Sequence, residues 1–350
     1  MILHLTMQEK FIKPFIDFTD DNFDIKEHFF LLVGGDNKFA IEDNAYTKSL
    51  QNKKDFLQYF LEFNKKMYTA DKIILHGLFQ PYNVIYLFFN PWLLQKCYWI
   101  IWGGELYSFE TPKVSLTSKI YEFMKAVCIK NFAGVIAYAT GDFDRAKEWY
   151  GAQGTFYKSL YYPYLAVENY LQHIKVSTQE ENIIMVGNSA TKTNEHLEIF
   201  ERLSMIKGIE NYQIIVPLSY GDMDYAQEVI KKGELCFGSK FNPLTDFMSS
   251  DAYYNLLCRV KIVIMGHKRQ QATGNILALV KFGKKVFIRT NISTWDFYAE
   301  NGIKMFKYEE MEEELLTPML QKDKNENLQS IQKRFTYKRV IQEWHGIYSA

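Results

Sequence analysis

The chain has 350 residues, 47 % of them hydrophobic, which excludes a disordered chain and suffices for two domains that each bury their own core. Its 41 Lys and Arg residues balance 41 Asp and Glu residues, so the chain lacks the global basic field by which nucleic acid is bound. Four widely spaced cysteines without metal-ligand spacing argue against a disulfide framework or a zinc module and indicate free thiols in a reducing compartment.

The first 18 residues meet charge early and do not build the apolar core and cleavage site of a secretory signal, which predicts a cytoplasmic location. The longest apolar runs, such as Val84–Phe89, are far shorter than the roughly 20 residues needed to cross a bilayer. The 16 % aromatic content suits cores, sugar-binding surfaces and membrane interfaces alike.

Short apolar runs alternate with helical patterns along the whole chain, which is typical of an α/β fold with parallel sheets and crossover helices. In the first half, strands are expected at 28–33, 72–75, 97–102 and 134–139, and helices at 55–68, 118–131 and 142–150. Glycines follow these strands. Because substrate sites form where parallel strands end, the functional residues are expected directly after the strands.

A second series follows the polar stretch 175–182, which we interpret as a linker between an N-terminal domain (1–174) and a C-terminal domain (183–325). Strands are expected at 183–186, 212–216, 235–237, 260–265 and 285–288, and helices at 194–206, 222–232, 252–259, 271–282 and 294–301. A closing C-terminal helix is expected within 326–350. The pattern predicts two doubly wound sheets facing a central cleft.

Two loops of the C-terminal domain are candidates for binding a nucleotide diphosphate. Gly187, Asn188 and Ser189 follow one strand and precede a helix, although the segment matches neither the dinucleotide nor the P-loop fingerprint. The second loop precedes another helix and offers a guanidinium fork, amides and a glycine that permits close approach. Its candidate residues are Arg269, Gln270, Gln271, Gly274 and Asn275. The alternative is an ordinary N-terminal helix turn for the first loop and a solvated basic turn for the second.

In the N-terminal domain, His76 and Glu105 follow strands, and either could take a proton from an attacking hydroxyl. For both, the alternative is a structural role with satisfied hydrogen bonds. Trp102 and Tyr107 could stack on sugar rings, although aromatic residues in strands are more often core. The pairs Asp142/Asp144 and Asp222/Asp224 have the form of a metal site, but their positions at helix starts favour helix capping, so no metal ligand is expected.

Several segments together resemble one known family, and the resemblance spans most of the chain. They are His76–Pro81, Trp99–Tyr107, Val186–Ser189 with Asn194–His196, Val216–Tyr220, Asp251–Tyr253, Arg269–Gln271, and Arg289–Asn291 followed by Trp295. The family comprises bacterial transferases that move 4-acetamido-4,6-dideoxy-galactose (Fuc4NAc) from its TDP-sugar to lipid II in the synthesis of enterobacterial common antigen. The sequence differs from the family pattern at Ala272, where the family has Gly, and at Glu105, where it has Asp.

The resemblance implies a GT-B glycosyltransferase with the nucleotide in its C-terminal domain and an undecaprenyl-diphosphate-linked acceptor facing its N-terminal domain, working on surface polysaccharide at the inner face of the inner membrane. Arg269 and the two loops would hold the TDP diphosphate without a metal, and His76 or Glu105 would be the base. Asn291 and Trp295 would contact the donor sugar. Alternatives are a UDP- or TDP-amino-sugar transferase of capsule or O-antigen assembly, and a non-catalytic sugar-nucleotide-binding protein.

A lipid-linked acceptor implies peripheral contact with the bilayer. The candidate segments are Asn90–Lys96 and the aromatic and basic helix Phe56–Tyr68. For the helix, packing of its apolar stripe against a sheet is the favoured alternative.

Overall fold

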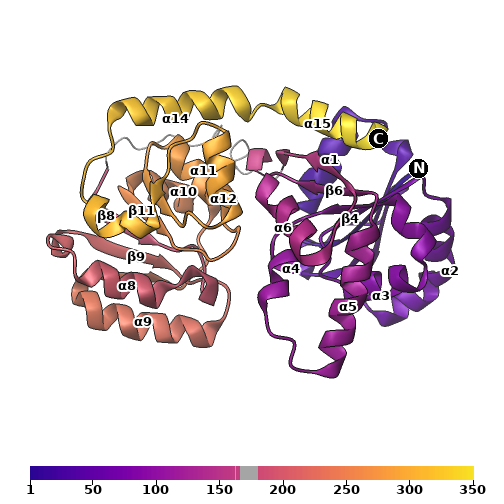
Figure 1. Cartoon of the computed structure of the whole chain (residues 1–350), viewed down its shortest axis with the longest axis horizontal. Helices are drawn as coiled ribbons and strands as arrows, with labels where there is room; N and C mark the ends of the chain where they lie inside the picture. Colours follow the sequence, from indigo (N-terminus) through magenta and orange to yellow (C-terminus); the bar gives the residue numbers. More distant parts are fainter. Residues whose placement is uncertain (162, 166–179) are drawn as a thin grey trace. The chain divides into compact units, whose positions relative to one another are not determined.

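The computed structural model describes residues 1–161, 163–165 and 180–350 of the chain (Figure 1). The chain forms two compact units: unit 1 comprises residues 1–159 and 341–350, and unit 2 comprises residues 160–340. Of the expected linker, only residues 180–182 are among the described residues. Each unit contains one parallel sheet with helices on its faces, as expected for an α/β fold.

The sheet of unit 1 has seven parallel strands in the order β3-β2-β1-β4-β5-β6-β7. The strands are β1 (Ile2–Gln8), β2 (His28–Gly35), β3 (Thr47–Leu50), β4 (Lys72–His76), β5 (Cys97–Ile100), β6 (Gly134–Ala137) and β7 (Thr155–Lys158). The helices are α1 (Ile12–Asn22), α2 (Lys53–Thr69), α3 (Pro81–Phe89), α4 (Gly104–Tyr107), α5 (Leu116–Asn131), α6 (Thr140–Tyr150) and the end of α15 (Tyr337–Ser349). The strand order reverses between β1 and β4, where open α/β sheets bind ligands.

The two faces of this sheet have different cores, because successive residues of a strand point to opposite faces. On one face, Leu3 and Leu5 of β1 pack in a cluster with residues of α2, α3, α5 and α6. On the other face, His4 lies near Phe15 of α1, and Phe15 contacts the ring of Trp344 of α15 at a centroid distance of 4.7 Å. The last helix of the chain therefore covers part of the first sheet.

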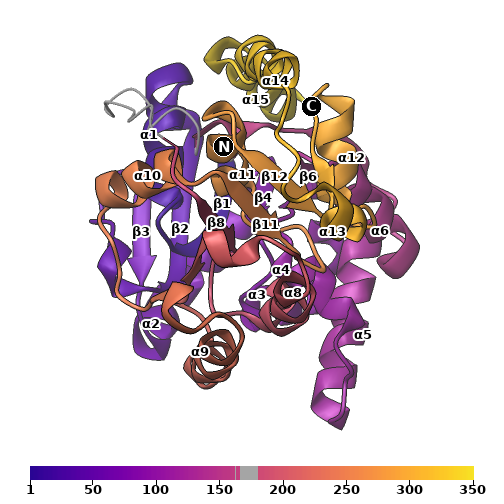
Figure 2. The same ribbon diagram turned by 90° about the vertical axis from the view of Figure 1, so that its left-hand side faces the viewer.

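The sheet of unit 2 has six parallel strands in the order β10-β9-β8-β11-β12-β13. They are β8 (Ile183–Val186), β9 (Gln213–Pro217), β10 (Phe241–Leu244), β11 (Ile262–Met265), β12 (Lys285–Ile288) and β13 (Phe306–Lys307). The helices are α8 (His196–Ser204), α9 (Met223–Phe237), α10 (Ser250–Arg259), α11 (Thr273–Lys281), α12 (Ser293–Glu300), α13 (Met311–Glu314) and α14 (Gln321–Arg334), before α15. The order reverses between β8 and β11, and Figure 2 shows this sheet from another direction.

Two expected elements in the second half of the chain are wrong. The expected strand 235–237 is the last turn of α9, and the strand lies further along, at Phe241–Leu244. This strand is at the edge of the sheet, where Pro243 is tolerated because no neighbour needs its missing N–H. The expected C-terminal helix is two helices, α14 and α15, because a new helix begins after Phe335 with the N–H of Arg339 bonded to Thr336 Oγ1.

Two further expectations concern cysteines and membrane spans. Cys97, Cys128 and Cys258 are buried free thiols, and Cys236 is a half-buried free thiol, which confirms the expectation that the cysteines are not paired. Within the described ranges, no helix is both long enough and apolar enough to cross a membrane.

Candidate active site

In unit 2, the polar loop that follows β8 is organised around the side chain of Asn194. Its Oδ1 accepts the backbone N–H of Asn188 at 3.1 Å and lies 2.8 Å from Nε2 of His267. Its Nδ2 donates to Thr191 Oγ1 at 2.6 Å and to the carbonyl of Ser189 at 3.1 Å. Asn194 is fully buried and holds the backbone of the loop, although it was not among the expected site residues.

The two candidate diphosphate loops lie together at the carboxyl end of the sheet, because they follow the adjacent strands β8 and β11. Gln271 Nε2 donates to Asn188 Oδ1 at 3.0 Å, and Thr193 Oγ1 donates to Gln271 Oε1 at 2.9 Å. The N–H of Lys268 also bonds to the carbonyl of Thr193. The candidates Asn188 and Gln271 are therefore neighbours at the position where the strand order reverses.

A close contact beneath the first loop requires a glycine. Gly187 has a φ of +68°, and a β-carbon on it would lie 2.5 Å from Nε2 of the buried ring of His196, the first residue of α8. Nδ1 of His196 lies 3.3 Å from the hydroxyl of Tyr225, while Nε2 has no hydrogen-bond partner. Burial lowers the pKa of His196 to about 3, so the ring is neutral beneath the loop.

The second loop ends at the N-terminus of α11. Ala272, the N-cap residue, has a φ of +55°, a conformation that favours glycine. Gly274 and Asn275 lie in the first turn, and Asn275 Nδ2 donates to the hydroxyl of Tyr253 at 3.2 Å. Arg269 is half-buried and donates to the carbonyl of Gln270, whose side chain is buried. Backbone donors and a guanidinium thus occur within one short segment.

The remaining candidates of unit 2 lie after β12. Asn291 is exposed, and Trp295 is half-buried in α12. Nearby, Arg289 donates to the carbonyl of Gly266 at 2.8 Å and forms a 2.7 Å ion pair with Glu198. These bonds connect the segment after β12 to the end of β11, so all candidate segments of unit 2 lie along the carboxyl edge of one sheet.

In unit 1, Glu105 is a buried carboxylate with an unsatisfied oxygen. It follows β5, and its Oε1 accepts the backbone N–H of Trp102 at 2.8 Å and the indole N–H of Trp99 at 3.3 Å. Its Oε2 has no hydrogen-bond partner. Burial raises its pKa to about 7, opposed by these hydrogen bonds. A carboxyl group with a free oxygen and a pKa near neutrality suits proton transfer.

Gly77 lies close to this carboxylate. Oε1 of Glu105 lies 3.6 Å from the position of a β-carbon on Gly77, which has a φ of +77° at the end of β4. The ring of Phe79 packs over Gly77 and Gly104. Gly77 and Phe79 were not among the expected site residues.

His76 lies in a buried row of three histidines on the face of the sheet covered by α1 and α15. Its Nε2 lies 3.0 Å from Nδ1 of His4, whose Nε2 lies 3.0 Å from Nδ1 of His28. The ring of His76 also contacts Phe15 edge-on at 4.8 Å. Burial lowers its pKa to about 3. Its role as a base stays a prediction, and this environment favours the structural alternative.

The aromatic candidates of unit 1 have different surroundings. Trp102 is half-buried two residues after β5, and its ring centroid lies 6.3 Å from that of Phe11 and 6.1 Å from that of Phe79. Tyr107 is buried in the core and donates from its hydroxyl to Asp142 at 3.1 Å. The structure therefore leaves Trp102 near the carboxylate, whereas Tyr107 packs within the unit.

Only one of the two Asp pairs contains the expected helix cap. Asp222 caps α9 by accepting the N–H groups of Asp224 and Tyr225, whereas the N-cap residue of α6 is Ala139, so the expectation for Asp142 is wrong. Within residues 1–161, 163–165 and 180–350, no three His, Cys, Asp or Glu side chains lie close enough to hold one metal ion.

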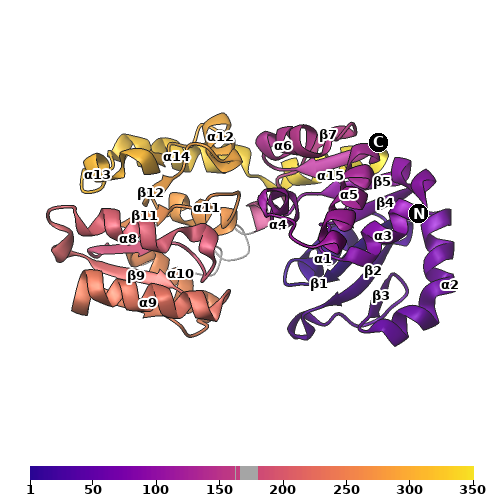
Figure 3. The same ribbon diagram turned by 60° about the horizontal axis from the view of Figure 1, so that its bottom comes forward.

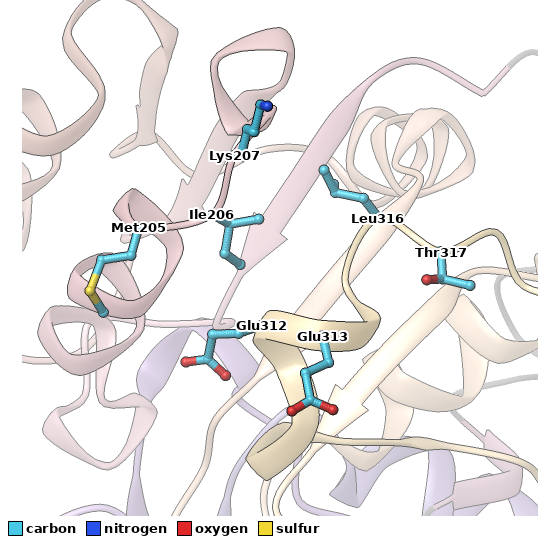
Figure 4. Close-up of a pocket in the computed structure, with 7 residues that line it drawn as sticks. All are labelled: Met205, Ile206, Lys207, Glu312, Glu313, Leu316 and Thr317. Carbon is cyan, nitrogen blue, oxygen red and sulfur yellow. The ribbon is translucent and has the colours of Figure 1, made fainter.

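A shallow hollow of unit 2 lies away from these loops (Figure 4). Its lining includes Met205 and Lys207, which follow α8, and Glu312 of α13. Because α8 runs back from the carboxyl ends of the strands, its end lies at the opposite edge of the sheet from the candidate loops. The hollow is therefore separate from the candidate site.

Solved structures of low sequence identity share this fold. Sucrose-phosphate synthase from Thermosynechococcus elongatus has a TM-score of 0.69 at 9 % identity, covering 100 % of this chain and 98 % of its own. HepE of Anabaena, solved with UDP and glucose, has a TM-score of 0.64 at 12 % identity, covering 100 % and 99 %. WaaG, a glycosyltransferase of lipopolysaccharide biosynthesis, has a TM-score of 0.54 at 9 % identity, covering 98 % and 93 %.

Two sheets of this kind with these structural neighbours define the GT-B fold of glycosyltransferases, as expected. The family model described as 4-alpha-L-fucosyltransferase, glycosyl transferase group 56, matches residues 13–349. The chain therefore belongs to this family and is a glycosyltransferase.

Proposed function

We propose that the protein transfers a 4-acetamido-4,6-dideoxyhexose, Fuc4NAc, from its TDP-sugar to an undecaprenyl-diphosphate-linked oligosaccharide at the inner face of the bacterial inner membrane. Membership of the fucosyltransferase family supports a deoxyhexose donor. The presence of UDP in the similarly folded HepE supports a nucleotide-sugar substrate. The product would enter surface polysaccharide synthesis.

The unpaired Oε2 of Glu105 is the observation that carries the chemical part of the proposal. In the proposed reaction, the acceptor hydroxyl oxygen forms a bond to the anomeric carbon of the donor while the bond from that carbon to the diphosphate oxygen breaks. The hydroxyl proton passes to Oε2 of Glu105, and TDP leaves with the electron pair. With a pKa of about 7, Glu105 is partly ionised at neutral pH and can accept this proton.

The loops of unit 2 would bind the donor. In the proposal, Arg269 and the N-terminal turn of α11, including Gly274 and Asn275, stabilise the charge that develops on the diphosphate. The Gly187–Ser189 loop approaches the diphosphate through its backbone, and no metal ion takes part. The hydrogen bond between the side chains of Asn188 and Gln271 supports a shared diphosphate site, because it holds the two loops in one arrangement before the donor binds.

Calorimetric titration of the purified full chain with TDP, UDP and GDP tests the donor side. TDP binding at least tenfold tighter than that of the other two would support the proposal. Preference for UDP would instead indicate a UDP-amino-sugar transferase of capsule or O-antigen assembly. Absence of binding to all three would contradict the donor proposal and favour a protein that does not turn over sugar nucleotides.

The acceptor side needs a transfer assay. TDP-Fuc4NAc is offered with an undecaprenyl-diphosphate-linked disaccharide or with the same disaccharide on a short water-soluble alcohol, and released TDP is measured. Release of TDP that requires an acceptor, together with a product heavier by one Fuc4NAc residue, is the expected result. Tight TDP binding without transfer to either acceptor would overturn the acceptor proposal and leave the donor proposal standing.

A further inference from the structure

Unit 1 exposes large apolar side chains on three neighbouring helices, α2, α3 and α5. We call the surface formed by these helices and the segments that adjoin them the α2-α3-α5 face. Its exposed members are Leu57, Phe60, Leu61 and Tyr68 of α2, Tyr82, Ile85 and Phe89 of α3, Trp92, Val114, and Leu116, Ile120 and Phe123 of α5. Soluble proteins seldom expose so many large apolar residues on neighbouring elements unless the surface has a partner.

The exposed stripe of α2 combines apolar side chains with lysines at both ends. Leu57 and Leu61 are one turn apart on the outside of the helix, and Leu61 is 82 % exposed. Lys54 and Lys65, also exposed, lie one turn before and one turn after them. The inner stripe of the same helix, including Phe63, packs in the core. The expected packing of this helix against the sheet is thus correct for one stripe, and a second apolar stripe remains uncovered.

Aromatic contacts make the face continuous from one helix to the next. The rings of Tyr68 in α2 and Trp92 after α3 are 6.3 Å apart, and the hydroxyl of Tyr68 bonds to Asn90. On the other side of α3, the ring of Phe88 lies 6.1 Å from that of Phe123 in α5. Figure 3 shows these helices in unit 1 from another direction. The surface is therefore one connected area rather than scattered residues.

The amino-terminal end of α5 adds a projecting tip. The loop before α5 and its first turn extend beyond the neighbouring α3 in Figures 1 and 2. This tip carries Val114, which is 91 % exposed, followed by Leu116. Lys119, one turn further, is exposed beside Ile120. Apolar side chains at a protruding end, followed by a lysine, can enter the boundary between headgroups and acyl chains.

Charge distinguishes this face from the other side of unit 1. Helices α2, α3 and α5 together contain seven lysines, of which Lys125 is buried and pairs with Glu122, against three acidic residues, although the whole chain is neutral. On the opposite face of the sheet, α1 contains one lysine and three aspartates. A basic apolar surface opposite an acidic helix complements anionic lipid headgroups and orients the unit towards them.

We propose that the α2-α3-α5 face docks peripherally on the surface of a bilayer that contains anionic lipids. In this arrangement, Leu61, Phe89 and Leu116 bury apolar surface at the level of the acyl chains. Lys54, Lys65 and Lys119 pair with headgroups, and Trp92 and Tyr68 lie at the interface. The proposal deepens the proposed function, since it presents unit 1 to a lipid-linked acceptor, but the contacts that carry it belong to unit 1 alone.

The test is cosedimentation of the full chain with vesicles of phosphatidylcholine containing 0 to roughly half phosphatidylglycerol, the range over which anionic surface charge attracts lysines. Binding should increase with the anionic fraction and decrease with salt. Combined Leu61→Gln and Leu116→Gln substitutions should lower the partition coefficient at least tenfold. Lys54→Gln with Lys65→Gln should lower it most at low salt.

Matched controls come from unit 2. Leu235, which is 81 % exposed on α9, and Leu320 before α14 receive the same Leu→Gln changes, and Lys231 and Lys240 receive the same Lys→Gln changes. These controls should bind vesicles as the unchanged protein does. Equal losses in the controls, or no binding at any anionic fraction, would overturn the proposal.

Sedimentation velocity without lipid completes the design. A concentration-dependent dimer that Leu61→Gln with Leu116→Gln dissociates would show that a second copy of the chain covers the face, and this too would overturn the proposal. Titration with TDP keeps the two proposals apart: vesicle binding without TDP binding contradicts the donor proposal alone, and TDP binding without vesicle binding contradicts membrane docking alone.

Discussion

The ring of His196 lies directly against Gly187, so that a β-carbon on residue 187 would be 2.5 Å from Nε2 of the histidine. The side chain of Asn194 closes the same space, with Oδ1 at 2.8 Å from that position. The first candidate diphosphate loop therefore has a floor made by an imidazole and an amide, and only a residue without a side chain fits above it.

Gly187→Ala should therefore lower the free energy of unfolding by about 2 kcal/mol, because it combines a positive φ with a contact against a buried ring. Urea unfolding measures the change. Gly346→Ala is the control, since the exposed Gly346 in α15 has no heavy atom near a new β-carbon and should gain up to about 1 kcal/mol. A double-mutant cycle tests the contact: Gly187→Ala should cost less in a His196→Ala background than in the unchanged protein, and an equal cost would contradict the contact.

Glu105→Gln should abolish most sugar transfer while leaving TDP affinity unchanged, because the amide keeps the carbonyl oxygen that accepts from Trp102 but cannot accept the hydroxyl proton. The unchanged enzyme should lose kcat as the pH falls below about 7, where Glu105 becomes protonated. Full transfer activity in the variant would remove Glu105 from the proposed mechanism.

The stability of the same variant gives an independent measurement. A pKa raised to about 7 from 4.5 means that the folded chain loses stability as the pH rises through this range, by at most about 3 kcal/mol. Glu105→Gln should thus unfold at higher urea concentration than the unchanged protein at pH 8, and the two should be similar at pH 4. His76→Asn is the comparison for the second base candidate: it should chiefly lower stability, because His76 is enclosed by His4 and Phe15.

Arg269→Ala should weaken TDP binding roughly ten- to a hundredfold, the usual effect of losing a charge-assisted contact to phosphate. The neighbouring Lys268→Ala provides the control, since Lys268 is exposed and pairs with Glu195 at 2.9 Å. Titration calorimetry with both variants measures the affinities. If Arg269→Ala bound TDP as tightly as the unchanged protein does, Arg269 would be excluded from the donor site.

Acid should destabilise the protein through its buried histidines. The pKa is lowered to about 4 for His28 and about 3 for His76, His196 and His267, mainly by burial. The unfolded chain therefore binds more protons than the folded chain below pH 6.5, and the free energy of unfolding should fall by up to about 1.4 kcal/mol per pH unit for each histidine. Glu105 partly offsets this loss of stability. Between pH 7 and 4.5 its carboxylate takes up a proton in the folded chain, whereas in the unfolded chain it stays largely ionised. Urea titrations from pH 7 to 4.5 measure the slope, which His28→Gln should reduce.

Removal of divalent cations should leave transfer largely unchanged, because the proposed donor site stabilises the diphosphate with Arg269 and helix amides. Transfer is measured with EDTA and again after adding Mn²⁺. Loss of activity that Mn²⁺ restores would indicate a metal-dependent reaction and would direct attention to Asp222 and Asp224.

The sequence was most informative where a strand is buried on both faces. The strands Ile183–Val186 and Lys285–Ile288 have the expected bounds, because buried parallel strands are short, mostly apolar runs. Strand β1 was missed because His4, Thr6 and Gln8 interrupt its apolar residues. These polar side chains are buried too, and His4 bonds to His28 and His76 on the neighbouring strands β2 and β4. Such pairing between strands cannot be inferred from a local pattern.

For the candidate site, the sequence could locate loops but not the contacts that shape them. Gly187 and Gln271 were selected because they follow strands and precede helices. Asn194 and His267 were not, since each is an ordinary polar residue until the fold brings them within 2.8 Å across 73 residues of sequence. In the same way, the free oxygen of Glu105 becomes visible only when its partners Trp99 and Trp102 are placed.

The return of α15 to unit 1 has a consequence for the order of synthesis. The first 159 residues leave the ribosome before the last ten, yet Trp344 and Tyr348 complete the aromatic cover over Phe15 and His28. The ammonium group of Lys72 also donates to carbonyls of those final residues, including the buried carbonyl of Ile347. Unit 1 can therefore complete the packing of its core only after unit 2 has been translated.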